Sequence, residues 1–311
     1  MFMSIFKLPL SIAISSMQKG DDVFRSKQKT FGNFNVKKDL NYSDDNESHH
    51  KLDIYYPINN SNGVTLLYVH GGGYIYGDNS QQDVFASWFV NQGFTVVVPN
   101  YQLGQKDGSI NIVDQVKDVV QVLRFIEKEH KYYSLPIKNF FLMGDSAGGH
   151  MCLLIDILYK NKELRDYYQI EEMPKLEIKG IALNSTMYDF VEVLNMGKKL
   201  LSKRGMKWMF SEKYKDEEFV KMNNPRHYFQ NGFRPVPLFA NTSFHDYFSN
   251  QSYRLNKDCT KYNIEIDYLY EASPNKAIGH VYNHFNFENE EGKRCNQAMV
   301  DFFLKNSKVA K

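Results

Sequence analysis

A serine flanked by glycines stands at the junction between a short apolar run and a helical pattern. The motif Gly-Asp-Ser-Ala-Gly-Gly spans residues 144–149, the apolar run covers 140–143, and the helical pattern covers 147–159. Glycines at 144 and 148 permit a sharp strand-to-helix turn that a Cβ would obstruct. Such a turn exposes a hydroxyl above the positive end of a helix. Ser146 is therefore the candidate nucleophile, and the alternative is a tight turn with an incidental serine.

Three consecutive glycines follow His70, directly after the apolar run at residues 64–69. Their amides have no side chains in the way of a ligand. This suits an oxyanion hole, whose donors must lie about 3 Å from a developing negative oxygen. We expect Gly72 and Gly73 to donate, with the amide of Ala147 as a third donor. His70 is expected to hold the loop in shape, and the alternative for the triple glycine is a flexible loop.

A nucleophilic serine needs a base, and the base needs a carboxylate that orients it. After a turn of this kind, the chain order is serine, then acid, then histidine. Asp246 follows the apolar run at 236–240 and is the expected acid. Asp189 follows the earlier run at 181–183 and stays as the alternative.

The base is expected after the last apolar run, residues 264–269, where two histidines occur. His280 is favoured because a glycine precedes it and Tyr282 can enclose it. His284 is the alternative, with a surface or supporting role for whichever histidine is not the base. His150, just inside the helix after the nucleophile, is expected to pack locally.

His49 and His50 lie in a polar, acidic stretch. We expect a solvated loop there and not a metal site, because no defined ligand spacing is present. The proposed chemistry needs neither a metal nor an organic cofactor, so none is expected.

The elements that must position these residues alternate along the chain. Helical patterns cover 112–126, 147–159 and 293–303. Strand-like runs cover 51–56, 64–69, 95–98, 140–143, 181–183, 236–240 and 264–269. This alternation predicts an α/β fold with a mostly parallel central sheet and helices on both faces.

Two stretches fall outside the alternation. Residues 187–233 lie between two buried strands and contain helical material, which predicts a helical cap insertion. We therefore expect an N-terminal segment at 1–46 and one α/β domain at 47–311 with that insertion. The apolar residues 1–17 carry an internal lysine and no cleavage site, so they are expected to pack on the domain near the active site. A membrane-surface contact and an export signal stay open for this segment.

Composition limits the classes of partner. The net charge is +2, from 38 basic and 36 acidic residues that are interspersed, which does not favour a nucleic-acid partner. Three cysteines without paired spacing favour a reducing compartment, so a cytoplasmic protein without stable membrane insertion is expected. The sequence leaves a homodimer open.

With these motifs located, the chain resembles α/β-hydrolase esterases of the hormone-sensitive-lipase-like group and bacterial carboxylesterases. The resemblance covers about residues 51–304, through the segments at 52–57, 70–73, 100–103, 144–149 and 279–282. It implies the α/β-hydrolase fold, with the oxyanion hole and nucleophile supplied by the two glycine-rich motifs. The chain departs from the pattern with Tyr-Gln-Leu at 101–103, where the family often has Tyr-Arg-Leu. It departs again with His-Asp-Tyr at 245–247, in place of Asp-Pro-Leu.

The expected activity is hydrolysis of small carboxylic esters (short-chain, aryl or acylated-sugar esters) through an acyl-enzyme. Tyr74, Tyr76 and Phe210 are expected to line the cleft. The same residues could cleave amides, as in arylformamidase-like or peptidase-like relatives. A non-catalytic ligand-binding receptor is a third alternative, although it would predict the loss of a catalytic residue.

Overall fold

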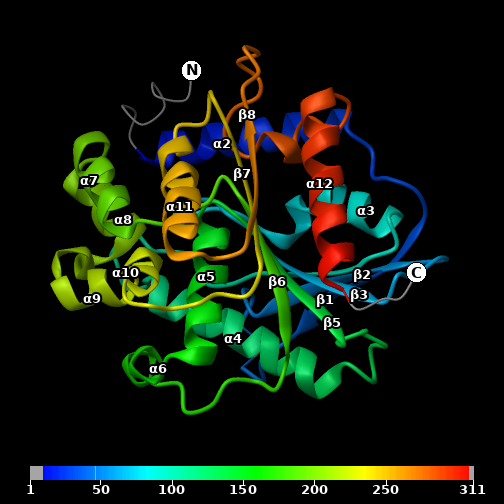
Figure 1. Cartoon of the computed structure of the whole chain (residues 1–311), viewed down its shortest axis with the longest axis horizontal. Coiled ribbons are helices and arrows are strands. Elements are labelled where there is room, and N and C mark those ends of the chain that lie inside the picture. The colour runs from blue at the N-terminus through cyan, green and yellow to red at the C-terminus, as the bar shows by residue number, and fades with distance from the viewer. Residues whose placement is uncertain (1–9, 46, 308–311) are drawn as a thin grey trace.

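An eight-stranded sheet forms the centre of the computed structural model, which describes residues 10–45 and 47–307. Its spatial order is β1-β2-β4-β3-β5-β6-β7-β8 (Figure 1). β2 runs antiparallel to both of its neighbours, and all pairings from β4 to β8 are parallel. The strands are β1 (Phe34–Asn41), β2 (Lys51–Pro57), β3 (Val64–Val69), β4 (Thr95–Pro99), β5 (Asn139–Asp145), β6 (Ile178–Asn184), β7 (Leu238–Ser243) and β8 (Ile266–Glu271).

Helices cover both faces of this sheet, with α5 and α12 on opposite sides of the strands in Figure 1. The helices are α2 (Leu10–Lys27), α3 (Asp83–Asn91), α4 (Ile112–Glu129), α5 (Ala147–Lys160), α6 (Lys162–Tyr168), α7 (Phe190–Leu200), α8 (Lys203–Phe210), α9 (Glu217–Met222), α10 (Pro225–Gln230), α11 (Ser249–Tyr262) and α12 (Glu290–Asn306). The predicted mostly parallel sheet with flanking helices is confirmed.

The central strands are apolar along their whole length because both of their faces are covered. All six residues of β3 are buried. Leu67 and Val69 pack into the core on the side of α4 and α5, whereas Leu66 and Tyr68 pack into the core on the side of α3 and α12. Continuous apolar runs are typical of parallel strands buried on two sides.

The edge strand β1 was not expected. Its residues are exposed or half-buried, so it lacks the apolar pattern of the inner strands. It pairs with β2 and therefore belongs to the sheet. The predicted domain boundary at residue 46 is wrong in this respect, since the α/β domain already includes Phe34.

Four helices, α7 to α10, connect β6 to β7, where the helical cap insertion was expected. α8 docks on the loop that follows β4. Trp208 donates from Nε1 to the carbonyl of Gly104 at 2.8 Å, and Ser211 donates from Oγ to the carbonyl of Gly108 at 2.7 Å. These contacts fix the insertion above the strand ends.

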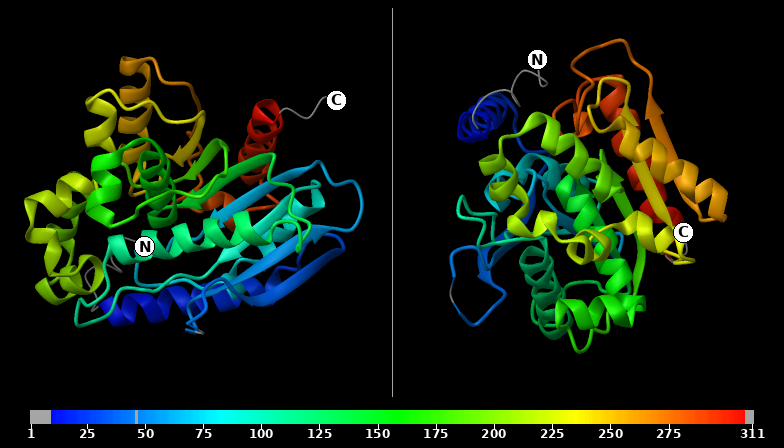
Figure 2. Two further views of the ribbon diagram at one scale, coloured as in Figure 1. Left: turned by 90° about the horizontal axis from the view of Figure 1, so that it is seen from below. Right: turned by 90° about the vertical axis from the view of Figure 1, so that its left-hand side faces the viewer.

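Helix α2 lies on the outside of the molecule, at the end where the loops after β7 and β8 emerge (Figures 1 and 2). Asp21 accepts a hydrogen bond from Tyr76 at 2.5 Å, and Arg25 pairs with Asp83 at 3.1 Å. Phe24 packs edge-on against Phe285, with ring centroids 5.1 Å apart. Of residues 1–17, which were expected to pack on the domain, those from Leu10 onward belong to α2, and residues 1–9 lie outside the described residues. No helix within 10–45 and 47–307 is long and apolar enough to cross a bilayer.

Candidate active site

Ser146 stands at the turn between β5 and α5 with a strained backbone. Its φ and ψ are 49° and −113°, outside the regions that residues with a Cβ normally adopt. The flanking glycines make room for the turn. A Cβ on Gly148 would lie 2.0 Å from the carbonyl oxygen of Val69, and one on Gly144 would lie 2.6 Å from the backbone of Gly148. Only glycine fits at these two positions, which explains the motif.

The glycine loop after β3 is folded tightly against this turn. Gly72 has a φ of 107°, and a Cβ there would lie 1.9 Å from the carbonyl oxygen of Tyr76. The amide of Gly71 donates to Oδ1 of Asp145, the residue before the nucleophile, at 2.9 Å. Burial raises the pKa of Asp145 to about 6, although hydrogen bonds from Tyr68 and Gly71 and the charge of His280 lower it. Asp145 thus holds the loop beside Ser146.

Three backbone amides at this place lack acceptors. Among the residues that the structure describes, the N–H groups of Gly72, Gly73 and Ala147 donate to no protein acceptor. Amides left unpaired at a strained turn are free to bind an anionic oxygen. The arrangement can therefore stabilise a negative charge that develops next to the Ser146 hydroxyl.

His70 supports the loop from below, as expected. Its Nδ1 lies 2.8 Å from the carbonyl of Gly71, and its ring stacks on Tyr101 with centroids 4.4 Å apart. Tyr101 also donates to the carbonyl of His70 at 2.7 Å. Burial lowers the pKa of His70 to about 4, so its ring is neutral at physiological pH.

Asp246 and His280 lie side by side, although they are 34 residues apart in the chain. Nδ1 of His280 donates to Oδ1 of Asp246 at 2.8 Å. The carboxylate also accepts from Thr242 Oγ1 and from the amide of Phe248, each at 2.8 Å. Burial alone would raise the pKa of Asp246, but His280 and the hydrogen bonds outweigh it and lower the pKa below its usual value. The carboxylate is thus ionised and can orient the imidazole.

Ser185, which sequence reasoning missed, joins the acid to the histidine loop. It follows β6 with a φ of 47°, and its Oγ accepts from the amide of Val281 at 3.0 Å. The same hydroxyl contributes a hydrogen bond that lowers the pKa of Asp246. Val281 itself has a φ of 54°, which is rare for a β-branched residue. The position directly after a strand end was the one signal in the sequence that could have pointed to Ser185.

The alternative acid lies elsewhere. Asp189 caps the first turn of α7 and pairs with Arg226 at 3.0 Å and with Arg254 at 3.4 Å. These contacts hold the start of α7 to α10 and α11.

His284, the alternative base, makes contacts away from Asp246. The ring of His284 stacks on Phe85 with centroids 3.6 Å apart. Its nitrogens lie 3.2 Å from the hydroxyl of Tyr68 and 3.3 Å from the side-chain amide of Asn184. Burial, with a smaller contribution from the charge of His280, lowers the pKa of His284 to about 3. The ring is a neutral part of the core behind the glycine loop.

The prediction that Tyr74 and Phe210 line an open cleft is wrong. Both are about 1% exposed, and their rings pack together with centroids 5.8 Å apart. The hydroxyl of Tyr74 lies 2.9 Å from Nδ1 of His150, whose Nε2 lies 2.9 Å from the carbonyl of Asn223. His150 thus packs locally, as expected, and carries its proton on Nε2. Tyr76 is half-buried and contacts α2 through Asp21.

Other side chains surround the reacting groups instead. The rings of Tyr247 and Phe248 pack on His280, with centroids 4.3 and 5.4 Å from the imidazole. From the cap, the Cε of Met209 would lie 3.3 Å from a Cβ on Gly73. The walls nearest the chemistry are therefore two aromatic rings on the histidine side and a methionine on the oxyanion side.

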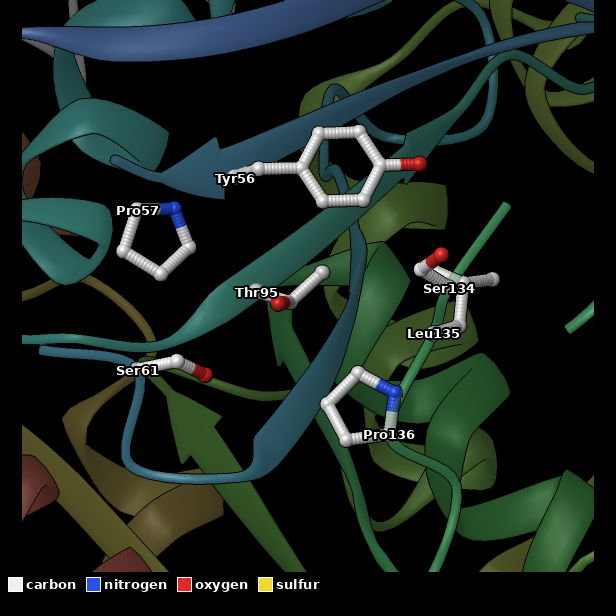
Figure 3. A pocket seen from close by; sticks show the side chains of 7 residues that line it. All are labelled: Tyr56, Pro57, Ser61, Thr95, Ser134, Leu135 and Pro136. Carbon is white, nitrogen blue, oxygen red and sulfur yellow. The ribbon is translucent and has the colours of Figure 1, made fainter. Parts of the chain in front are cut away.

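A hollow of about 370 Å³ lies at the end of the sheet opposite to Ser146, where the strands β3, β4 and β5 begin (Figure 3). It is lined by Tyr56, Pro57, Ser61, Thr95, Ser134, Leu135 and Pro136. None of these lining residues has an acidic or basic side chain. Because ligands of parallel α/β sheets bind outside the carboxyl ends of the strands, we assign the chemistry to the Ser146 end.

Comparison with known proteins identifies the family of the chain. The model of the BD-FAE family matches residues 52–258, which is more than half of the chain and includes both Ser146 and Asp246. The chain belongs to the BD-FAE family.

Curated proteins with similar sequences include a kynurenine formamidase from Salmo salar and an acetylxylan esterase from Xylanibacter ruminicola. The formamidase is 31% identical over 47% of this chain and 44% of its own length. The acetylxylan esterase is 33% identical over 38% of this chain and 24% of its own length. The BD-FAE chain described here thus spans less than half the length of these curated relatives.

Solved structures establish the fold. Esterase B from Lactobacillus rhamnosis superposes with a TM-score of 0.85 at 21% identity, over 96% of this chain and 94% of the other. A bacterial heroin esterase superposes with a TM-score of 0.70 at 14% identity, over 96% and 92%. This BD-FAE family member therefore has the α/β-hydrolase fold.

Proposed function

We propose that this protein hydrolyses carboxylic esters through an acyl-enzyme on Ser146, with Asp246 and His280 completing a catalytic triad. The hydrogen bond from Nδ1 of His280 to the buried Asp246 carries the proposal, because it fixes the tautomer in which Nε2 is free to accept a proton. The lowered pKa of Asp246 supports the same role, since an ionised carboxylate stabilises the imidazolium that forms.

The reaction proceeds in two acyl transfers. His280 takes the proton of the Ser146 hydroxyl as Oγ attacks the ester carbonyl carbon. The amides of Gly72, Gly73 and Ala147 stabilise the oxyanion, and each such donor is worth about 10²- to 10³-fold in rate. The alcohol departs with the proton from His280. A water molecule, activated by His280, then releases the carboxylic acid and restores Ser146.

We propose short-chain acyl groups, acetyl above all, as the preferred substrates. The curated relatives of this chain include an acetylxylan esterase and an acetyl esterase. The methionine of the cap next to Gly73 supports a short acyl site, because a side chain so close to the oxyanion loop limits the space beside it. The rings of Tyr247 and Phe248 provide an apolar surface on the histidine side.

Replacement of the nucleophile tests the chemistry. Ser146→Ala should lower the hydrolysis of p-nitrophenyl acetate by about 10⁴-fold or more and abolish labelling by a fluorophosphonate probe. Ser26→Ala, which removes an exposed hydroxyl on α2, serves as the matched control and should keep both. Undiminished labelling of Ser146→Ala would refute the assignment.

A chain-length series tests the substrate class. We expect kcat/KM to fall from p-nitrophenyl acetate through butyrate to octanoate. Met209→Ala should raise the relative rate on butyrate. A rise in kcat/KM with chain length in the wild-type protein would contradict the preference for short acyl groups while leaving the nucleophile assignment intact.

Amide hydrolysis is a second candidate, since a kynurenine formamidase is among the similar proteins. The same groups would attack a formamide carbonyl, with His280 protonating the departing amine. Comparison of kcat/KM for an aryl formamide and an aryl acetate decides between the two. We expect the acetate to be the better substrate.

The three cysteines, Cys152, Cys259 and Cys295, are buried and unpaired. This favours a reducing compartment, and we propose a cytoplasmic protein.

A further inference from the structure

Two histidines in the loop between β1 and β2 meet a carboxylate from α4. The prediction of a solvated loop is wrong for His50, which is 9% exposed, and Asp118 beside it is 5% exposed. One ligand atom from each of His49, His50 and Asp118 lies within 4.8 Å of the other two. Asp118 comes 68 residues after His50, so the loop sequence alone could not show this cluster.

Both nitrogens of His50 face carboxylates. Nδ1 lies 2.7 Å from each oxygen of Asp45, and Nε2 lies 3.2 Å from Oδ1 of Asp118. In a neutral ring with its proton on Nδ1, the lone pair of Nε2 would point at a negatively charged oxygen. That arrangement is repulsive unless a cation, either a second proton or a metal ion, lies between the two atoms.

Hydrogen bonds from neighbouring residues orient the side chains of His50 and Asp118, as they do for the ligands of metal sites. Histidines that bind metals usually donate their other ring N–H to a carboxylate, as His50 does to Asp45. Asp118 is held in place from the opposite side by Gln102. The backbone amide of Gln102 donates to Oδ2 at 2.8 Å, and its side-chain amide donates to Oδ1 at 3.2 Å. Both inner ligands are therefore oriented before any ion arrives.

The spacing also suits a small divalent ion. With metal–ligand bonds of about 2.0–2.1 Å, neighbouring ligand atoms of a tetrahedral site lie about 3.3 Å apart. The separation of Nε2 of His50 and Oδ1 of Asp118, 3.2 Å, agrees with that value. His49 is half-buried, so it leaves the site reachable from solvent and has only a short distance to close.

We propose that His49, His50 and Asp118 form a binding site for Zn²⁺, with water in the remaining position. Two imidazoles and one carboxylate are ligands that Zn²⁺ and its first-row neighbours accept, whereas Ca²⁺ and Mg²⁺ require oxygen ligands. The ion would fasten the β1–β2 connection to α4. The cluster contains none of the groups assigned to ester hydrolysis, so this site is separate from the one at Ser146.

Titration of the full-length protein after chelator treatment tests the site. Isothermal titration calorimetry with ZnCl₂ should give one saturable equivalent in the wild-type protein. His49→Gln should weaken this binding at least about tenfold, because it removes one of three protein ligands. The control is His130→Gln, at the end of α4, which removes a partly exposed histidine outside the cluster and should bind as the wild type does. Equal affinity in the wild type and His49→Gln, or no saturable binding in the wild type, overturns the proposal.

A measurement on the wild-type protein does not depend on how the variants fold. Zn²⁺ should shift the ring-nitrogen NMR signals of His49 and His50 and leave those of His130 and His227 in place. Shifts confined to His130 or His227 overturn the proposal. The same titration on Ser146→Ala should give the wild-type affinity, so the outcome is independent of the proposed hydrolysis.

Discussion

His280 donates from Nδ1 to Oδ1 of Asp246 at 2.8 Å, and the carboxylate is almost completely shielded from solvent. The two residues come from loops that follow different strands, β8 and β7. This contact favours the tautomer that carries the ring proton on Nδ1 and leaves Nε2 as the acceptor. The proposed acid thus sets the tautomer of the proposed base.

Asp246→Asn should separate this role from a general effect on folding. An amide can offer an N–H where the carboxylate accepted one, which favours the wrong tautomer of His280, so kcat should fall by roughly 10⁴-fold. The variant should stay folded, with about 1–3 kcal/mol lost from the free energy of unfolding because the buried carboxylate gives up charged hydrogen bonds. Steady-state kinetics on p-nitrophenyl acetate and urea denaturation measure the two effects.

Asp189→Asn is the matched variant, which should lose stability and keep its activity. It weakens the contacts with Arg226 and Arg254, which are themselves partly exposed, so we expect about 1–3 kcal/mol of lost stability and nearly normal kcat. A catalytic defect in Asp189→Asn as large as that of Asp246→Asn would mean that the acid has been misassigned.

Ser185→Ala should impair positioning and leave substrate binding intact. The variant loses the hydrogen bond to Asp246 and the acceptor for the amide of Val281. A single hydrogen bond is worth about 1–1.5 kcal/mol, so kcat should fall about tenfold while KM stays within about twofold. Ser252→Ala is the control, since that buried hydroxyl makes one long contact, 3.4 Å, to the carbonyl of Asn241. A rise in KM with unchanged kcat in Ser185→Ala would exclude a positioning role.

Gly72→Ala should abolish activity for steric reasons. The new Cβ would lie 1.9 Å from the carbonyl oxygen of Tyr76, so the loop that carries the oxyanion donors must move. Gly63→Ala is a control with a similarly unfavourable backbone, a φ of 71°, but with no atom within 4 Å of the added Cβ. It should cost only about 1 kcal/mol of stability and keep kcat. Comparable losses of activity in both variants would show that backbone strain, and not the clash, is responsible.

Three histidines should stay neutral in the folded protein on acidification. Burial lowers the pKa of His70 and His150 to about 4 and that of His284 to about 3. Because the folded pKa lies below the unfolded value near 6.5, each ring contributes stability at neutral pH that declines as the pH falls from 6.5 towards 4. Ring-nitrogen NMR between pH 7.5 and 5.5 should show no titration of these three. A midpoint near 6.5 for any of them would contradict its buried, neutral state.

The nucleophile motif and the glycine loop could be predicted because each is continuous in the sequence. The glycines on either side of Ser146 permit the turn without help from distant residues. Three glycines after a buried strand predict backbone amides that no side chain obstructs. The strands β3 to β7 were predictable for a similar reason, since burial on both faces favours a continuous apolar run. β2 was predicted from its partial alternation, and β8, at the other edge of the sheet, from the run at 264–269. The edge strand β1 was not predicted, because its residues are exposed or half-buried and form no continuous apolar run.

Contacts between segments that are distant in the chain could not be predicted from the sequence. Ser185 reaches Asp246 only because β6 and β7 are neighbouring parallel strands, so the loops that follow them lie side by side. Tyr74 was expected in a cleft, yet the loop turns it inward towards His150. The meeting of His50 with Asp118 depends on how the β1–β2 connection lies against α4. In each case a residue type alone gives no information about which partner the fold supplies.

Helix α2 precedes the whole sheet in the chain, and its partners come from two distant segments, one after β3 and one after β8. Asp21 contacts Tyr76, Arg25 contacts Asp83, and Phe24 contacts Phe285. During translation, the contacts with Tyr76 and Asp83 can form long before the contact with Phe285. The docking of α2 is therefore complete only when the segment after β8 has been added.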